Sequence, residues 1–348
     1  MTRSGDVARL ATVYIVLSVC SVGTRAQSSP AAKPPASQNH KIAATSPRVS
    51  LAPRFVPGQT FRYQMEFETT TNTSRSGLTV DPEGPTSLVV DWNAAVRMEV
   101  LAAGDDTPGG IRLRTTYEKS AATINSDTFD PAAAETSEQY RSLEGKVVEF
   151  TIDAAGNVKY VAGIEDLVDS QKAAQSAREW IAQIGASGGA PPGGVVVGQK
   201  WTSDQPADSL PIAGLVWHTD SEYLRNEPCH PANPDVPEAP APGEKFSAAP
   251  DCAVVLANLS LIRSKTAHDL TPAELRKNGV TSAGKWSGSA QSLLYVSLDT
   301  GMVVSSTQTS TESMDVTLTS NRDTSLRYAG TISSRSHVTL LAERADGK

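Results

Sequence analysis

A two-residue alternation of apolar and polar side chains constrains the fold of this chain more than any other feature. Residues 61–68, FRYQMEFE, alternate aromatic residues and methionine with Arg, Gln and Glu. Residues 90–100, VDWNAAVRMEV, and 111–118, IRLRTTYE, repeat the pattern. Because successive side chains of a strand point to opposite faces, this spacing predicts antiparallel strands with one packed face and one wet face.

Strand patterns continue through the second half of the chain. They occupy residues 195–204, 214–225, 252–264, 287–299, 302–320 and 326–343. No fixed-period repeat is evident, which argues against propellers and solenoids. About a dozen antiparallel strands predict a strongly curved sheet, a barrel-like fold or two packed sheets.

The stretch EFTIDAAGNVKYVAG, residues 149–163, combines an acid with a glycine and therefore raises the question of a metal-binding loop. A calcium loop needs oxygen side chains at alternate positions and a distal Glu. Ala154 and Ala155 occupy the middle of this segment. Apolar alternation on both sides of DAAGN predicts a plain β-hairpin instead.

One segment has helical periodicity. Its apolar residues recur three or four positions apart in IEDLVDSQKAAQSAREWIAQIGA, residues 164–186, and GASGGAPPGG ends the pattern. The members of this stripe are Ile164, Leu167, Val168, Ala174, Ala177, Ile181 and Ile184. The predicted fold class is therefore mainly β with one long helix (α+β), the helix lying against one face of the sheet.

The first residues resemble a secretory signal peptide. Arg3 and Arg9 precede an apolar run at 10–23, and cleavage is expected between Ala26 and Gln27. The alternative is a lipoprotein signal with Cys20 as the lipidated residue, which Val19 disfavours because that position normally holds a smaller residue. Either signal predicts an extracytoplasmic protein, periplasmic or secreted.

The expected organisation is a signal peptide at 1–26, a disordered Pro/Ala/Ser-rich linker at 27–53 and a β-rich domain at 54–345. This domain is either a single unit or two halves, at 54–204 and 211–345. Cleavage at Ala26 leaves 28 basic and 37 acidic residues, a net charge of −9. An acidic chain without a basic run is a poor partner for nucleic acid, and no mature segment is predicted to span a membrane.

Several short motifs resemble those of a family of secreted bacterial β-rich proteins of unknown function. They are GQTFRYQMEF, then a D-x-x-G-x-V hairpin with the helix pattern after it, and the V-G-x-x-W of GGVVVGQKW. The resemblance covers most of residues 57–343. It implies fold and location, and it transfers no catalytic residue.

The mature chain has two cysteines, Cys229 and Cys252, which border a proline-rich loop between two predicted strands. In an exported protein such a pair predicts a disulfide. The alternative is a metal site that adds His218 and His230, but zinc usually needs four well-spaced ligands.

Catalytic motifs are scarce. No G-x-S-x-G elbow or H-E-x-x-H occurs, and Ser282 with Lys285 matches S-x-x-K without its partner motifs. The sequence therefore predicts no cofactor and an exported non-enzymatic binding or envelope-associated module, with an apolar small molecule or an envelope component as its partner. The alternatives are a secreted hydrolase with an unrecognised site and a purely structural or interaction protein.

A ligand cleft between helix and sheet is the predicted site of such binding. Its expected lining residues are Trp201, Trp217, Leu167, Ile181 and Ile184.

The mature protein is predicted to begin at Gln27. Intact-mass measurement of the exported protein should give the mass of residues 27–348. A mass that corresponds to an acylated Cys20 at the terminus would contradict the soluble form.

Overall fold

The fold is described from a computed structural model of the chain. The residues described are 48–77, 86–101, 110–127, 137–152 without 139, 158–166, 190–207 without 192, 210–229, 250–264, 269–321 and 324–341.

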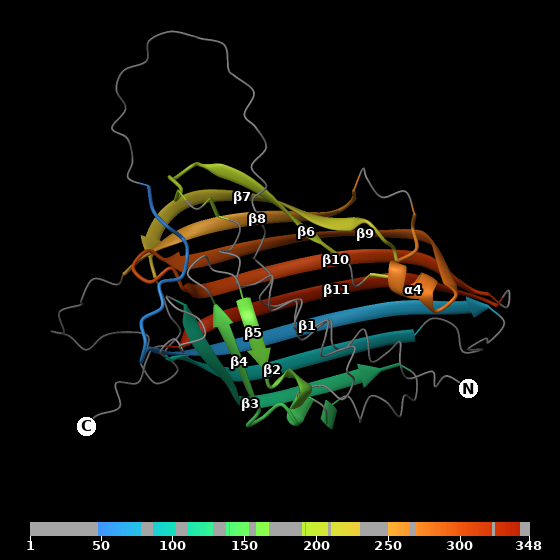
Figure 1. Ribbon diagram of the computed structural model, residues 1–348, viewed down its shortest axis with the longest axis horizontal. Helices are drawn as coiled ribbons and strands as arrows, with labels where there is room; N and C mark the ends of the chain where they lie inside the picture. The colour runs from blue at the N-terminus through green and yellow to red at the C-terminus, as the bar shows by residue number, and fades with distance from the viewer. Residues whose placement is uncertain are drawn as a thin grey trace, which may run out of the picture.

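Eleven antiparallel strands form one continuous curved sheet (Figure 1). The strands are β1 (Thr60–Gly77), β2 (Thr86–Leu101), β3 (Ile111–Ser126), β4 (Val147–Ile152), β5 (Val158–Ala162), β6 (Lys200–Pro206), β7 (Leu215–Pro228), β8 (Asp251–Arg263), β9 (Val280–Ser297), β10 (Val303–Ser320) and β11 (Ser325–Leu341). Their order is β5-β4-β3-β2-β1-β11-β10-β9-β8-β7-β6.

The sheet consists of two meanders joined by the first and last strands. Strands β1 to β5 follow one another outward in one direction, and β6 to β11 return from the other edge. Strand β1 pairs with β11 from Arg62↔Leu341 to Gly77↔Leu326. The long strands β1, β11, β10 and β9 therefore run side by side through the middle of the molecule, as Figure 1 shows.

The register sorts the side chains into an apolar face and a polar face, because residues directly opposite each other in paired strands point to the same side. Met65 lies between Ala94 of β2 and Val338 of β11, all on the apolar face. Its neighbour Glu66 lies between Asn93 and His337 on the polar face. The predicted alternation is thus observed in β1 and β2, whereas the middle of β9, β10 and β11 carries small and polar residues on the same face.

Short segments cover parts of the apolar face. At the β1–β3 side, Tyr140 and Leu143 pack against Trp92, which is fully buried. The indole N–H of Trp92 donates to Ser120 Oγ at 3.0 Å, and this hydroxyl donates to the carbonyl of Tyr140 at 2.6 Å. This relay satisfies the indole and ties the covering segment to the sheet.

Both ends of the apolar face on the β6–β10 side are also covered. Val49 forms an isolated bridge with Val195, and both pack against the cluster around Tyr223 and Val255. Ile212 and neighbouring apolar residues pack against the other end of β7, β8 and β10. The end of the expected linker therefore contacts the sheet at Val49, whereas residues 27–47 lie outside the described residues.

The predicted long helix, and with it the α+β class, is wrong: the described chain is nearly all β and contains no helix of seven or more residues. Its helical segments are residues 137–141 without 139, the 3-10 turn η2 (Ile164–Asp166) and α4 (Ala273–Lys277), and none of them is long enough to cross a membrane. Residues 167–186 of the prediction fall outside the described residues. Helical periodicity shows which residues of a helix would share an apolar face, but it does not show that the helix forms. In proteins, most of the stability of a helix comes from packing against other elements.

Of the three expected sheet arrangements, the barrel-like fold and the two packed sheets are not what the described strands form. The described strands form a single open sheet with β5 and β6 as its edges. The strand count alone could not decide this, because the closure of a sheet depends on which edges pair. The predicted hairpin is present as the antiparallel pair β4–β5, and its turn lies outside the described residues.

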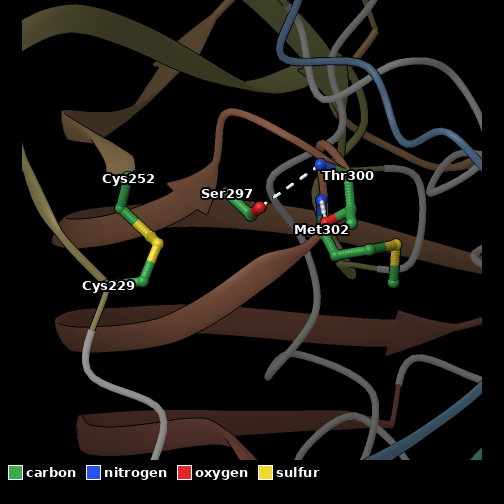
Figure 2. The surroundings of a disulfide bond; sticks show 5 residues. All are labelled: Cys229, Cys252, Ser297, Thr300 and Met302. Atoms are coloured by element: carbon green, nitrogen blue, oxygen red, sulfur yellow. Dashed lines mark hydrogen bonds between the residues drawn. A yellow bond between two sulfur atoms is a disulfide. The ribbon is translucent and has the colours of Figure 1, made fainter. Parts of the chain in front are cut away.

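A disulfide joins Cys229 to Cys252, as predicted (Figure 2). It connects the end of β7 to the start of β8, and both cysteines are buried. The adjacent β9–β10 turn is closed by the N–H of Thr300, which donates to Ser297 Oγ at 3.2 Å. The two thiols are therefore not available to the metal site considered above, and His230 lies outside the described residues.

Loss of the disulfide should destabilise the fold. In the chain-entropy model, closing a loop of this size restricts the unfolded chain and stabilises the protein by about 3 kcal/mol. The double variant Cys229→Ala/Cys252→Ala should therefore unfold at a lower urea concentration, and the wild type should match it under reducing conditions. Equal urea midpoints for oxidised wild type and variant would contradict this role of the disulfide.

Candidate ligand-binding face

The middle of the apolar face is lined by small and partly exposed side chains. On β9, β10 and β11 the cross-strand row Ala290–Ser310–Ser334 crosses this region. Each of the three is partly exposed, whereas their neighbours Ser289, Thr311 and Ser333 on the polar face are exposed. Here we call this row, with the flanking Leu259 and Ile332, the central strip. Because its side chains are short, the strip rises less above the sheet than the covered ends of the face do.

Four buried polar atoms border the central strip without a hydrogen-bond partner among the described residues. They are Trp201 Nε1, Ser203 Oγ, Thr219 Oγ1 and Ser292 Oγ. Ser203 and Thr219 are directly paired across β6 and β7, and Ser292 lies on β9. An unsatisfied buried polar group costs about 1–3 kcal/mol, so four of them on one face need an explanation.

Two tryptophans and a glutamate meet on the same face beside the strip. The indole N–H of Trp286 donates to Glu312 Oε2 at 2.7 Å. A Cβ atom on Gly288 would lie 2.7 Å from Trp217 Cη2 and 3.0 Å from Glu312 Cγ. The ring of Trp217 therefore reaches across β8 to the strand that carries Trp286, and the absent side chain of Gly288 leaves room for it.

Glu312 is an acid on the face that carries the apolar clusters. Burial raises the pKa of its carboxyl above the usual range, and the hydrogen bond from Trp286 opposes this shift without cancelling it. Among the described residues, no basic side chain forms an ion pair with Glu312. The carboxyl is thus a partly buried acid that accepts a hydrogen bond from the indole of Trp286.

The polar face carries the ion pairs. Glu149 of β4 receives hydrogen bonds from Arg112 and from Arg114, the latter at 2.7 Å. Burial tends to raise the pKa of Glu149, but these two guanidinium groups lower it overall. Across β1, β2 and β3, Arg62 and Arg97 pair with Glu118. These ion pairs are partly exposed to solvent, so each of them contributes little to the stability of the fold.

A row of Asp204, His218 and Ser260 on the polar face has the residue types of a hydrolytic triad. These residues are directly opposite one another on β6, β7 and β8. His218 Nδ1 lies 2.6 Å from Asp204 Oδ1, and this hydrogen bond raises the pKa of the imidazole. However, His218 Nε2 lies 3.6 Å from Asp220 Oδ1 rather than in a described hydrogen bond with Ser260.

This row also lacks the surroundings that such chemistry needs. It lies on an open strand surface, where Asp204 and Asp220 expose more than half of their side chains. On β7 and β8, sheet pairing engages the backbone N–H groups that could form an oxyanion hole. The row therefore does not form a catalytic centre.

A shallow depression of about 330 Å³ lies nearby on β8, β9 and β10. All the side chains that line it are uncharged, and Gln291 Nε2 donates to Asn258 Oδ1 across it at 2.9 Å. Within the described ranges, no group of three or more His, Cys, Asp or Glu residues could hold a metal ion.

The residues predicted to line a cleft are partly placed by the structure. Trp201 and Trp217 share the apolar face, but Trp201 packs in the cluster of Val195 and Tyr223, whereas Trp217 packs with Trp286. Leu167, Ile181 and Ile184 lie outside the described residues. The structure therefore does not place the predicted cleft between helix and sheet, because the helical residues that would line it are not described.

Sequence reasoning missed Trp286 and Glu312. A usable signal was present in the parity of β10, where Met314, Val316 and Leu318 are apolar residues at even spacing. Glu312 shares their even spacing, which puts it on the apolar face. The sequence could not show that Trp286 and Trp217 lie beside it, because β7 and β9 are brought together only by the sheet.

Comparison with known proteins does not identify a family. No protein-family model and no curated protein matches the chain. Among solved structures, lipovitellin, from a study of its lipid–protein interactions, is 11% identical with a TM-score of 0.43. That match covers 85% of this chain, which spans about a quarter (26%) of the lipovitellin chain. The outer membrane protein OprG from Pseudomonas aeruginosa is 7% identical with a TM-score of 0.17, covering 84% of this chain and 100% of OprG.

An outer membrane channel from Pseudomonas putida F1 is also 7% identical, with a TM-score of 0.18, and the match covers 83% of this chain and 97% of the channel. TM-scores this low establish neither a shared fold nor a shared function. The resemblance to secreted bacterial β-rich proteins stays a prediction.

The unpartnered hydroxyl of Thr219 should make the ligand-free protein less stable than it could be. Thr219→Val keeps the shape of the side chain and removes the unsatisfied group, so the free energy of unfolding should rise by about 1 kcal/mol. Ser282→Ala is the matched control, because Ser282 Oγ donates to the carbonyl of Leu270 at 3.1 Å and its loss should destabilise. Equal destabilisation by both changes would show that Thr219 has a partner.

Proposed function

We propose that the protein is an exported, non-enzymatic binding module that holds an elongated apolar or amphiphilic molecule on the apolar face of its sheet. The observation that carries the proposal is the central strip itself, a partly exposed row of short side chains between the covered apolar clusters. The buried polar atoms beside it, which have no partner among the described residues, are a second sign that this face is not packed as an ordinary core.

The chemistry of the face suits an amphiphile. Hydrocarbon would cover the partly exposed Leu259 and Ile332, and removal of apolar surface from water is favourable by roughly 25 cal/mol per Å². A carbonyl or hydroxyl of the ligand would exchange a hydrogen bond with the partly exposed Ser310 of the strip. Ligand sites commonly combine an apolar lining with a few placed polar groups in this way.

The proposed location is outside the cytoplasm, in the periplasm or the medium. The disulfide supports this location, because such bonds persist in oxidising compartments and are rare in reducing ones. The predicted signal peptide at 1–26 points in the same direction.

Bulk placed on the central strip tests the proposal. In Ala290→Trp, the indole should occupy the strip, so the variant should bind the neutral apolar dye N-phenyl-1-naphthylamine at least about tenfold more weakly, as expected when roughly 1.4 kcal/mol of binding energy is lost. The matched control is Ser289→Trp, which places the same ring on the polar face one residue earlier and should leave dye binding unchanged.

Stability separates an open strip from a filled one. An open strip should accept the ring with little change in the urea midpoint, whereas a packed strip should lose roughly 1–3 kcal/mol from overpacking. Destabilisation of Ala290→Trp together with no dye binding by the parent protein would overturn the proposed function.

A further inference from the structure

We propose that Trp217, Trp286 and Glu312 bind the positively charged ammonium group of the ligand, so that the molecule held on the apolar face is a cationic amphiphile. This inference rests on the proposed function and adds the chemical class of the head group.

The three side chains converge on one point of the apolar face. The Trp217 ring and the Glu312 stem meet over Gly288, where a Cβ atom would be 2.7 Å and 3.0 Å from them. Trp286, on the strand of Gly288, holds Glu312 Oε2 through its indole N–H at 2.7 Å. The carboxyl is therefore oriented by one indole and flanked by the other, with neither ring fully buried.

The charge of this site has no counterpart within the described residues. The basic residue nearest along the sheet register, Lys285, pairs with Asp315 on the opposite face. Asp315 itself forms a bidentate pair with Arg327 at 2.7 and 2.8 Å on that polar face. A carboxylate left on an apolar face without a cation is costly, and a bound cation would remove this cost.

The two indoles select the kind of cation. Tryptophan is the best side chain for cation–π attraction, and aromatic residues combined with an acid are typical of sites for alkylammonium groups. A divalent metal ion is a poor fit, because Mg²⁺ and Ca²⁺ require six or more oxygen ligands and the cluster offers one carboxylate. A carboxylate or sulfate head group would be repelled by Glu312.

Continuity with the central strip supports an amphiphile rather than a free amine. Glu312 is directly paired with Gly288 and Ile332, and Ser310 of the strip is two residues away on the same strand. An alkyl chain attached to an ammonium group at Glu312 would therefore lie along Ile332 and the strip. The ammonium group would contact Glu312 and the two indoles, and the alkyl chain would contact the central strip.

Two ten-carbon probes that differ in their head groups test this inference on the full mature protein. Decyltrimethylammonium and decanol, both below their aggregation concentrations, would compete with N-phenyl-1-naphthylamine. The wild type should bind the cation about tenfold more tightly than the alcohol, as expected for a desolvated cation–π contact with a carboxylate. Glu312→Gln should lose this preference and keep its affinity for decanol.

Controls keep the outcomes distinct. Asp315→Asn, three residues along β10 on the polar face, should keep the preference. Equal binding of both probes by the wild type, or a preference that persists in Glu312→Gln, would overturn the cationic head group and leave the proposed function intact. Failure of both probes to compete would overturn the proposed function itself. Glu312→Gln should unfold at a urea concentration no lower than wild type, so a lost preference cannot be ascribed to misfolding.

Discussion

The antiparallel pairing of β1 with β11 is the interaction on which the rest of the structure depends. It joins the meander of β1–β5 to that of β6–β11, so that two sets of locally connected strands share one apolar face. The approach is close: a Cβ atom on Gly330 would lie 2.1 Å from the carbonyl oxygen of Asn72. Because the paired strands are far apart in sequence, the cost in loop-closure entropy is large and this step should come late in folding.

A single amphipathic sheet must cover its apolar face by some means, and the cover described here is uneven. Tyr140, Val195 and Ile212 cap the sides and ends, each within its own cluster. Between them the central strip has small side chains and unpartnered polar atoms nearby. This unevenness distinguishes the face from an ordinary core, in which buried polar groups are satisfied and volume is filled.

The ion pairs around Glu149 and the isolated carboxyl of Glu312 differ in how their charges are satisfied. On the polar face, Arg112, Arg114 and Glu149 satisfy one another at the surface and need no further partner. On the apolar face, Glu312 has an indole for a neighbour and no described cation. The first arrangement keeps a sheet face soluble, whereas the second concentrates uncompensated charge next to apolar surface. Such concentrations are more common at binding sites than in structural positions.

The sequence by itself determined the strands, their two faces and the disulfide, because side-chain alternation and cysteine spacing are local properties of the chain. The parity of Glu312 with Met314 is equally local, although the sequence analysis did not use it. Only the tertiary structure decided that the strands form one open sheet and that residues 164–166 form a short turn in place of the start of a long helix. It also brought Trp217 beside Trp286. These outcomes depend on which distant segments meet, and no pattern within a single segment specifies its partner.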